Sequence, residues 1–268
     1  MAKGFRTWDD YFIPGTSVLR NVEGITDGDQ LRRYEEAQAH VRLVELADAP
    51  LPATFDYDHM KAIHRHIFQD VYEWAGEERV GPVGFMSKDG HSYYPAGPTL
   101  TEAAHAEYRK LASKDFLRGL DKAAFVDELA ERWGELNVIH SFREGNTRTQ
   151  FVFFSQLAEN AGYRIDTDAF RVGSPLRDEF VAARFHSQDT GSNTQLAAVL
   201  SKAIEPIDRR PAAPPQLHPE LQRIVDLNKL NFPTSATEIR APEPGSSTPG
   251  RGHVPPQQGL STDYGYGR

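Results

Sequence analysis

Apolar residues recur every three or four positions along most of the first two hundred residues, the spacing typical of helices with one buried face. In the first such segment the apolar positions are Leu31, Tyr34, Ala37, Val41 and Val44. Pro50 and Pro52 follow it, and proline ends helices because it lacks a backbone N–H and clashes with the preceding turn. The same pattern predicts helices over residues 29–47, 56–68, 99–112, 121–138, 147–161, 175–186 and 192–204.

Two of these predicted helices flank a short polar stretch. Asp121 is placed to cap residues 121–138, whose apolar face consists of Phe125, Leu129, Trp133 and Leu136. Residues 147–161 are apolar nearly all round, as expected of a helix in the centre of a bundle, and Gly162 is well placed to end it. We therefore expect this pair to be buried and to position the polar residues between them.

Residues 80–95 follow a different pattern, in which two short β-prone segments flank an Asp89-Gly90 turn. No other segment carries a hairpin signal. The sequence therefore predicts an all-α fold, a helical bundle with one small β-hairpin. From the residues alone, the hairpin is a plain surface feature.

Composition divides the chain into three parts. Residues 1–29 are glycine-containing and aperiodic, so we interpret them as an N-terminal arm, and residues 30–205 form the expected helical domain. Ten of the 18 prolines lie between Pro211 and Pro256, and this polar, proline-rich composition cannot bury enough apolar surface to offset the entropy of ordering. Residues 206–268 are therefore predicted to be a mostly disordered tail.

Charge and cysteine content exclude several classes of protein. A net charge of −8 disfavours a general nucleic-acid or anionic-membrane binder. The absence of cysteine excludes disulfides, cysteine nucleophiles and thiolate metal sites. The N-terminus has no apolar signal region and no apolar run approaches the ~20 residues that span a bilayer, so we expect a cytoplasmic protein with no membrane partner.

The polar stretch between the two central helices contains the strongest functional signal. Glu144 offers a hard oxygen ligand for Mg²⁺, Gly145 permits close backbone approach, and Asn146 is a good helix N-cap. The free N–H groups of the helix that follows would bind anions, and the forked guanidinium of Arg148 suits phosphate oxygens. His140 is the candidate general base, because an ordinary imidazole titrates near ~6.5 and can accept a proton at neutral pH. A capped helix start with a buried histidine would need neither Phe142 nor Arg148, so the ordered set favours chemistry on a polyphosphate.

This stretch resembles the Fic (filamentation induced by cAMP) motif, H-x-F-x-[D/E]-G-N-[G/K]-R-x-x-R, in which proline usually follows the histidine. The matching positions are His140, Phe142, Glu144, Gly145, Asn146 and Arg148. Three positions depart from the pattern: Ser141 replaces the usual proline, Thr147 the Gly or Lys, and Phe151 the second arginine. A weaker resemblance covers roughly residues 30–205 and includes residues 71–76 ahead of the hairpin.

The resemblance implies a Fic fold and the transfer of AMP from ATP to a hydroxyl of a target protein, with Mg²⁺ as cofactor. It makes His140 the catalytic base, Glu144 the metal ligand, and the phosphate-binding residues Gly145, Asn146, Thr147 and Arg148. It also implies that the hairpin is a flap that aligns a segment of the target beside the active site. The flap residues expected to contact the target are Met86, Ser87, Lys88 and Tyr93.

The departures keep other functions open. Relatives with lysine in place of Thr147 phosphorylate instead, so threonine favours AMP transfer. Phe151 removes a cation that contacts the γ-phosphate in the family, which indicates either altered nucleotide choice or ordinary core packing. The alternatives are therefore a Fic enzyme that uses another nucleotide (UTP, GTP or CDP-choline), a kinase, or a degenerate domain that binds nucleotide or a partner without turnover.

Many family members are restrained by a helix bearing [S/T]-x-x-x-E-[G/N]. Thr234 and Glu238 match the first part of this pattern, but Ile239 follows, so the sequence has no full match. The resemblance leaves room for a separate antitoxin chain as a further partner.

Overall fold

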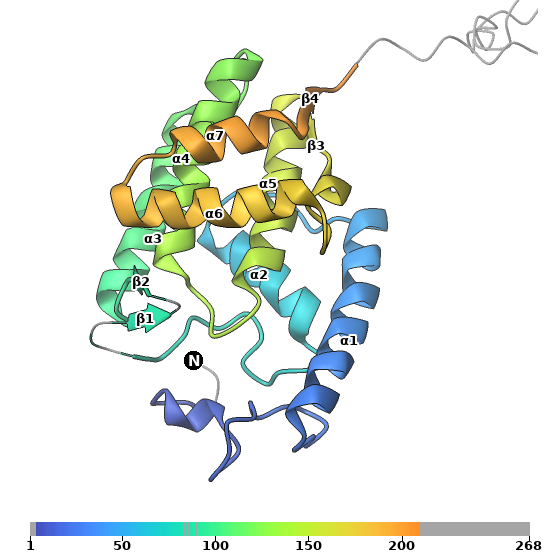
Figure 1. The fold of residues 1–268 in the computed structure, drawn as a ribbon, viewed down its shortest axis with the longest axis vertical. Helices are drawn as coiled ribbons and strands as arrows, with labels where there is room; N and C mark the ends of the chain where they lie inside the picture. Colours follow the sequence, from blue (N-terminus) through green and yellow to red (C-terminus); the bar gives the residue numbers. More distant parts are fainter. Residues whose placement is uncertain (1–3, 83, 85, 89, 209–268) are drawn as a thin grey trace, which may run out of the picture. The chain divides into compact units, whose positions relative to one another are not determined.

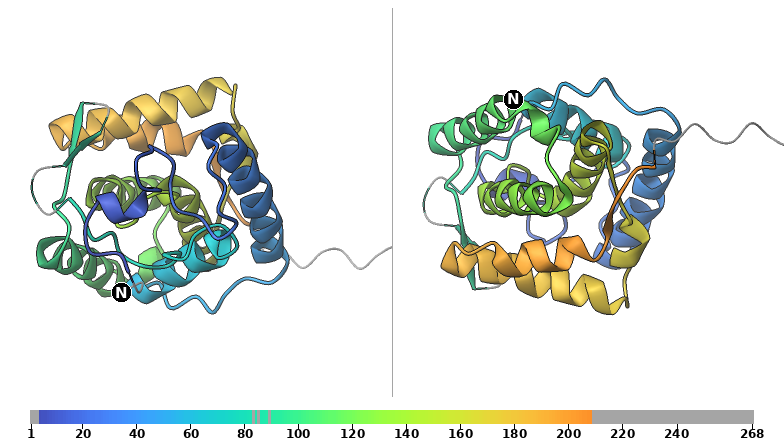
Figure 2. Two further views of the ribbon diagram at one scale, coloured as in Figure 1. Left: turned by 90° about the horizontal axis from the view of Figure 1, so that it is seen from below. Right: turned by 90° about the horizontal axis from the view of Figure 1, so that it is seen from above.

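Two helices, α4 (Lys122–Ile139) and α5 (Asn146–Ala161), occupy the centre of the computed structural model, and the other helices are arranged around them (Figures 1 and 2). The structure describes residues 4–208 except 83, 85 and 89. The surrounding helices are α1 (Gly28–Asp48), α2 (Tyr57–Phe68), α3 (Pro98–Ser113), α6 (Pro175–Thr190) and α7 (Thr194–Ser201). Short 3-10 turns lie at Asp9–Tyr11, Asp115–Leu117 and Thr167–Phe170. The predicted all-α fold is confirmed.

The helices begin where capping side chains occur in the sequence. Asp27 accepts a hydrogen bond from the N–H of Gln30 at 2.7 Å, and Asp121 accepts one from Ala124 at 2.9 Å. These carboxylates satisfy N–H groups that have no partner inside the helix. Gly162 ends α5 in the left-handed conformation, as its position predicts.

One helix prediction is too long at its end. α7 stops at Ser201, and Ile204–Pro206 forms strand β4, which pairs antiparallel with β3 (Tyr163–Ile165). Ile204 is fully buried in this pairing. The apolar residue that extended the predicted helix therefore belongs to a second small sheet, whose two strands are too far apart in the sequence for a hairpin signal.

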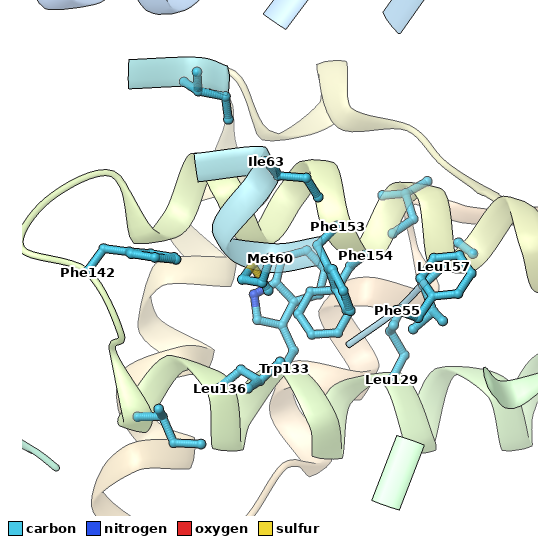
Figure 3. Packing of buried hydrophobic residues seen from close by; sticks show 14 of the residues in the cluster. Phe55, Met60, Ile63, Leu129, Trp133, Leu136, Phe142, Phe153, Phe154 and Leu157 are labelled. Atoms are coloured by element: carbon cyan, nitrogen blue, oxygen red, sulfur yellow. The ribbon is translucent and has the colours of Figure 1, made fainter. Parts of the chain in front are cut away.

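The core lies where the two central helices meet α2 (Figure 3). Trp133 of α4 stacks on Phe154 of α5, with ring centroids 4.4 Å apart, and both side chains are fully buried. Phe153 packs edge-to-face against Phe55 and Tyr108, so aromatic contacts join α5 to the elements around it. The predicted apolar face of α4 is buried, which fixes the end of α4 from which the polar stretch begins.

The predicted hairpin is present, with β1 (Met86–Lys88) and β2 (His91–Tyr93) paired antiparallel and Ser87 opposite Ser92. It rests on α6, because the His91 ring stacks on Phe185 at 3.9 Å and its Nδ1 lies 2.8 Å from an Asp189 oxygen. Gln188 of α6 donates to the Ser92 carbonyl, so that carbonyl points away from β1. Ser87 and Ser92 therefore form a non-hydrogen-bonded pair, and the Ser87 N–H faces the outer edge of the hairpin.

The residues before α1 pack onto the same core. Phe5 and Tyr11 are 3% and 1% exposed, and the Tyr11 ring lies edge-on to Trp74. The expected tail falls almost wholly outside the described residues. Within those residues, no helix combines the length and the hydrophobicity needed to cross a membrane.

A truncation in the core tests the central packing. Phe153→Ala is expected to lower the free energy of unfolding by about 3–5 kcal/mol, because it removes a fully buried ring and leaves a cavity among four aromatic neighbours. The control is Val172→Ala, at a residue that is 86% exposed. It should change the free energy of unfolding by no more than ~0.5 kcal/mol. Urea denaturation measures the free energy of unfolding of both variants. Similar losses in the two would contradict the assignment of Phe153 to the centre of the core.

Candidate active site

His140 directly follows α4 and has the left-handed backbone conformation, with φ 50° and ψ 59°. This conformation is unfavourable for a residue with a Cβ atom, so the surrounding contacts must hold it. The His140 N–H donates to the Leu136 carbonyl at 3.2 Å, and the half-buried imidazole lies 4.6 Å from the ring of Tyr93 on the hairpin. The candidate base therefore sits at the junction of α4 and the hairpin.

Arg79 is the buried residue that supports this junction, and only 1% of it is exposed. Its guanidinium donates to the carbonyls of His140 at 2.7 Å and of Gly81 at 3.1 Å, and also to those of Tyr94 and Ile139. Burial lowers the pKa of Arg79 to about 10, which still leaves it charged at neutral pH. No motif in the sequence distinguishes Arg79 from the other arginines, so the sequence gives no sign of its role.

His64 of α2 supports the loop from the opposite side. Its ring stacks on Phe142, with centroids 3.9 Å apart. Nδ1 accepts from the Gly76 N–H at 2.8 Å, so Nε2 carries the proton and donates to the Glu144 carbonyl at 3.0 Å. Burial lowers the pKa of His64 to about 3, and the residue is neutral. Both of its nitrogens thus bond to backbone groups, which leaves none for a metal.

Gly145 and Asn146 differ in role from the sequence expectation. Gly145 is the N-cap of α5 and has φ 79°, and a Cβ atom there would lie 2.3 Å from the Phe68 ring. Asn146 is already the first helical residue, so the prediction that it caps the helix is wrong. Its amide instead closes the loop, because Oδ1 accepts from the Phe142 N–H and Nδ2 donates to the Phe142 carbonyl. The first N–H groups of α5 still lack acceptors within the helix.

His140 and the loop residues that follow it line one small cavity of about 130 Å³. Six predicted site residues meet there, and Tyr93 of the hairpin joins them, whereas Met86 of β1 is not among the lining residues. Two residues of α6 that the sequence analysis did not select also contribute. The full lining is Tyr93, His140, Glu144, Gly145, Asn146, Thr147, Arg148, Arg184 and Phe185.

Arg148 lines the cavity but is also paired with a carboxylate. Its guanidinium donates to Glu35 of α1 and lies over the Phe68 ring at 4.7 Å. Tyr72 donates its hydroxyl to the same carboxylate, so Glu35 accepts two hydrogen bonds. The ion pair with Glu35 positions Arg148 at the cavity and offsets part of the arginine's charge. Glu35 gave no signal in the sequence, because it reaches the site from a helix more than a hundred residues away.

Arg184 reaches the cavity from α6, where its Nη1 donates to the Thr147 hydroxyl at 2.9 Å. Partial burial lowers the pKa of Arg184. Phe151 does not line the cavity and instead packs against Trp133, Phe170 and Phe180 at centroid distances of 5.0, 5.3 and 5.2 Å. Of the two interpretations of Phe151, its contacts favour core packing.

The comparisons with known proteins agree with this geometry. Residues 54–158 match the family model described as Fic/DOC family. The probable protein adenylyltransferase y4lH of Sinorhizobium fredii is 39% identical over 160 residues, which are 59% of this chain and 79% of that protein. The chain belongs to the Fic/DOC family.

A longer match joins this Fic chain to the protein adenylyltransferase VbhT of Bartonella schoenbuchensis, at 37% identity over 228 residues. That match covers 82% of this chain but 45% of VbhT, so the chain spans less than half of that relative. Among solved structures, the Fic domain of Bep8 from Bartonella sp. 1-1C is similar, with a TM-score of 0.65, 28% identity, and coverage of 73% of this chain and 94% of that one. BepC of Bartonella tribocorum, solved with bound AMPPNP, has a TM-score of 0.67 at 23% identity and covers 74% of this chain and 97% of its own.

The buried His64 predicts a pH dependence of stability. Histidine in the unfolded chain titrates near ~6.5, above the folded value of about 3, so between them the unfolded state binds more protons. The free energy of unfolding should therefore fall as the pH decreases from ~6.5, by up to about 1.4 kcal/mol per pH unit. Urea denaturation at a series of pH values measures this slope. His64→Gln, which cannot titrate, should flatten it, and equal slopes in both proteins would refute the assignment.

Proposed function

We propose that this chain transfers AMP from ATP to a hydroxyl group of a target protein. The observation that carries the proposal is the single cavity that brings together His140, Glu144, Arg148 and the N-terminus of α5. This arrangement supports the proposal, because a candidate base, a hard oxygen ligand and anion-binding groups line the same cavity. The adenylyltransferase names of the relatives support the same reaction.

The residues of the cavity divide the reaction between them. His140 accepts the proton of the target hydroxyl, whose oxygen attacks the α-phosphorus and forms a new P–O bond. The bond between the α-phosphorus and the bridging oxygen breaks, and pyrophosphate leaves. Arg148 and the N–H groups at the start of α5 stabilise the negative charge that moves onto the phosphate oxygens.

Glu144 fits the role of a magnesium ligand. Its carboxylate lines the cavity, and one of its oxygens accepts from the Gly145 N–H at 3.2 Å. Within the described ranges no group of three or more His, Cys, Asp or Glu side chains could hold a metal ion. A single carboxylate is nevertheless enough for Mg²⁺ in nucleotide sites, because phosphates and water complete its octahedral shell. When bound there, the ion neutralises phosphate charge and orients the nucleotide.

The hairpin beside the cavity is the proposed docking site for the target. Tyr93 lines the cavity from β2, and among the described residues the outer edge of β1 at Ser87 pairs with no further strand. An extended segment of the target that pairs with this edge would bring its hydroxyl close to His140. Docking by backbone pairing would depend on the hydrogen-bonding groups of the strand edge more than on its side chains.

The first test of the proposal uses labelled nucleotide. Label from α-³²P-ATP should appear on protein, and His140→Ala should reduce the rate by about 10²–10⁴ because the base is lost. His40→Ala, at an exposed position on α1, is the matched histidine control. Label from γ-³²P-ATP instead would assign a kinase. Nucleotide binding without transfer of either label would assign a non-catalytic domain.

A second test isolates the edge of the hairpin. Ser87→Pro removes the outward N–H without removing a hydrogen bond between β1 and β2, so target modification should fall about tenfold while ATP affinity changes much less. Ser87→Ala keeps the N–H, and a loss shared by both variants would assign the effect to the side chain. Equal losses of ATP binding and modification in Ser87→Pro would instead make the hairpin structural support for the cavity.

A further inference from the structure

Two arginines, Arg148 and Arg184, line the cavity, and they differ in how their charges are used. Arg148 is paired with Glu35, whereas in the part of the chain that the structure describes no carboxylate lies within ion-pair distance of Arg184. Its one hydrogen bond there is to the neutral hydroxyl of Thr147, and its buried Nε makes none. A partly buried cation whose partner is a hydroxyl keeps most of its capacity to attract an anion.

The side chain is also held in place before any ligand binds. Its guanidinium lies over the Phe180 ring, 5.4 Å from the centroid. Phe180 is 1% exposed and packs against Phe151 and Trp133, so the surface beneath the guanidinium is rigid. Thr147 holds Nη1 of the same guanidinium at the first turn of α5. A preorganised cation loses little conformational entropy on binding an anion.

We infer that Arg184 of α6 binds a phosphate group of the nucleotide, which adds a third anion-binding element to Arg148 and the N-terminus of α5. The inference rests on the proposed function, because it takes the cavity to be the nucleotide site. It assigns a role to the pair Thr147–Arg184, in which the threonine hydroxyl orients the guanidinium towards the cavity. It also accounts for Phe151, whose ring supports Phe180 and through it the arginine.

The experiment compares nucleotides that differ in phosphate content. Affinities of adenosine, AMP, ADP and ATP are measured by calorimetry or NMR titration for the wild type, Arg184→Gln and Arg184→Lys. Arg184→Gln should weaken ATP binding tenfold or more and leave adenosine within twofold. Arg184→Lys, which keeps the charge but loses the fork, should recover part of the loss. The shortest nucleotide whose affinity falls identifies the phosphate that Arg184 contacts.

Two controls separate the possible outcomes. Arg164→Gln removes the same charge from an exposed position on β3 and should leave all the affinities unchanged. Thr147→Val removes the hydroxyl without altering α6 and should weaken ATP binding severalfold, so the idea remains testable even if Arg184→Gln does not fold. Equal losses for adenosine and ATP, or unchanged ATP affinity in Arg184→Gln, overturn the inference alone. A wild-type protein that binds no nucleotide overturns the proposed function and the inference with it.

Discussion

The arrangement of the active site depends on the guanidinium of Arg79. It is buried without a carboxylate and is satisfied by backbone carbonyls from three segments: the end of α4, the chain at Gly81, and the chain after β2 at Tyr94. A buried cation is tolerated where several carbonyl dipoles point at it, and each carbonyl is in turn satisfied by the cation. The left-handed backbone of His140 persists because this network holds it. One side chain therefore sets the relative positions of the base, the loop and the hairpin.

Electrostatic balance around the cavity follows from which groups are paired. Glu35 offsets the charge of Arg148, and the neutral His64 shapes the loop without adding charge. Arg184 brings a positive charge from α6, and Glu144 brings a negative one suited to a divalent cation. The cavity is thus positive where the first turn of α5 begins and negative at the loop before it, a division that suits phosphates bound together with a metal ion.

The parts of the structure that could be predicted are those encoded locally. Helical periodicity, the aspartate caps and the Asp89-Gly90 turn each act over a few residues, and the motif residues from His140 to Arg148 are contiguous. The residues that were missed reach the site from distant elements: Glu35 from α1, His64 from α2, Arg79 from the chain after α2, and Arg184 from α6. The pairing of β3 with β4 and the closure of the loop by Asn146 likewise depend on tertiary contacts. Sequence periodicity carries no information about such contacts.

Residues 184–189 of α6 contact both the cavity proposed to bind the nucleotide and the hairpin proposed to dock the target. Arg184 lines the cavity proposed to bind the nucleotide, while Phe185, Gln188 and Asp189 contact the hairpin through His91 and Ser92. A helix transmits a small rotation or shift along its length because its backbone is rigid on this scale. Any displacement of α6 that accompanies one binding event therefore alters the free energy of the other, and linkage requires the effect to be equal in both directions. Under the proposed function, one helix supports both the nucleotide cavity and the docking hairpin, so a movement of α6 would couple the binding of donor and acceptor.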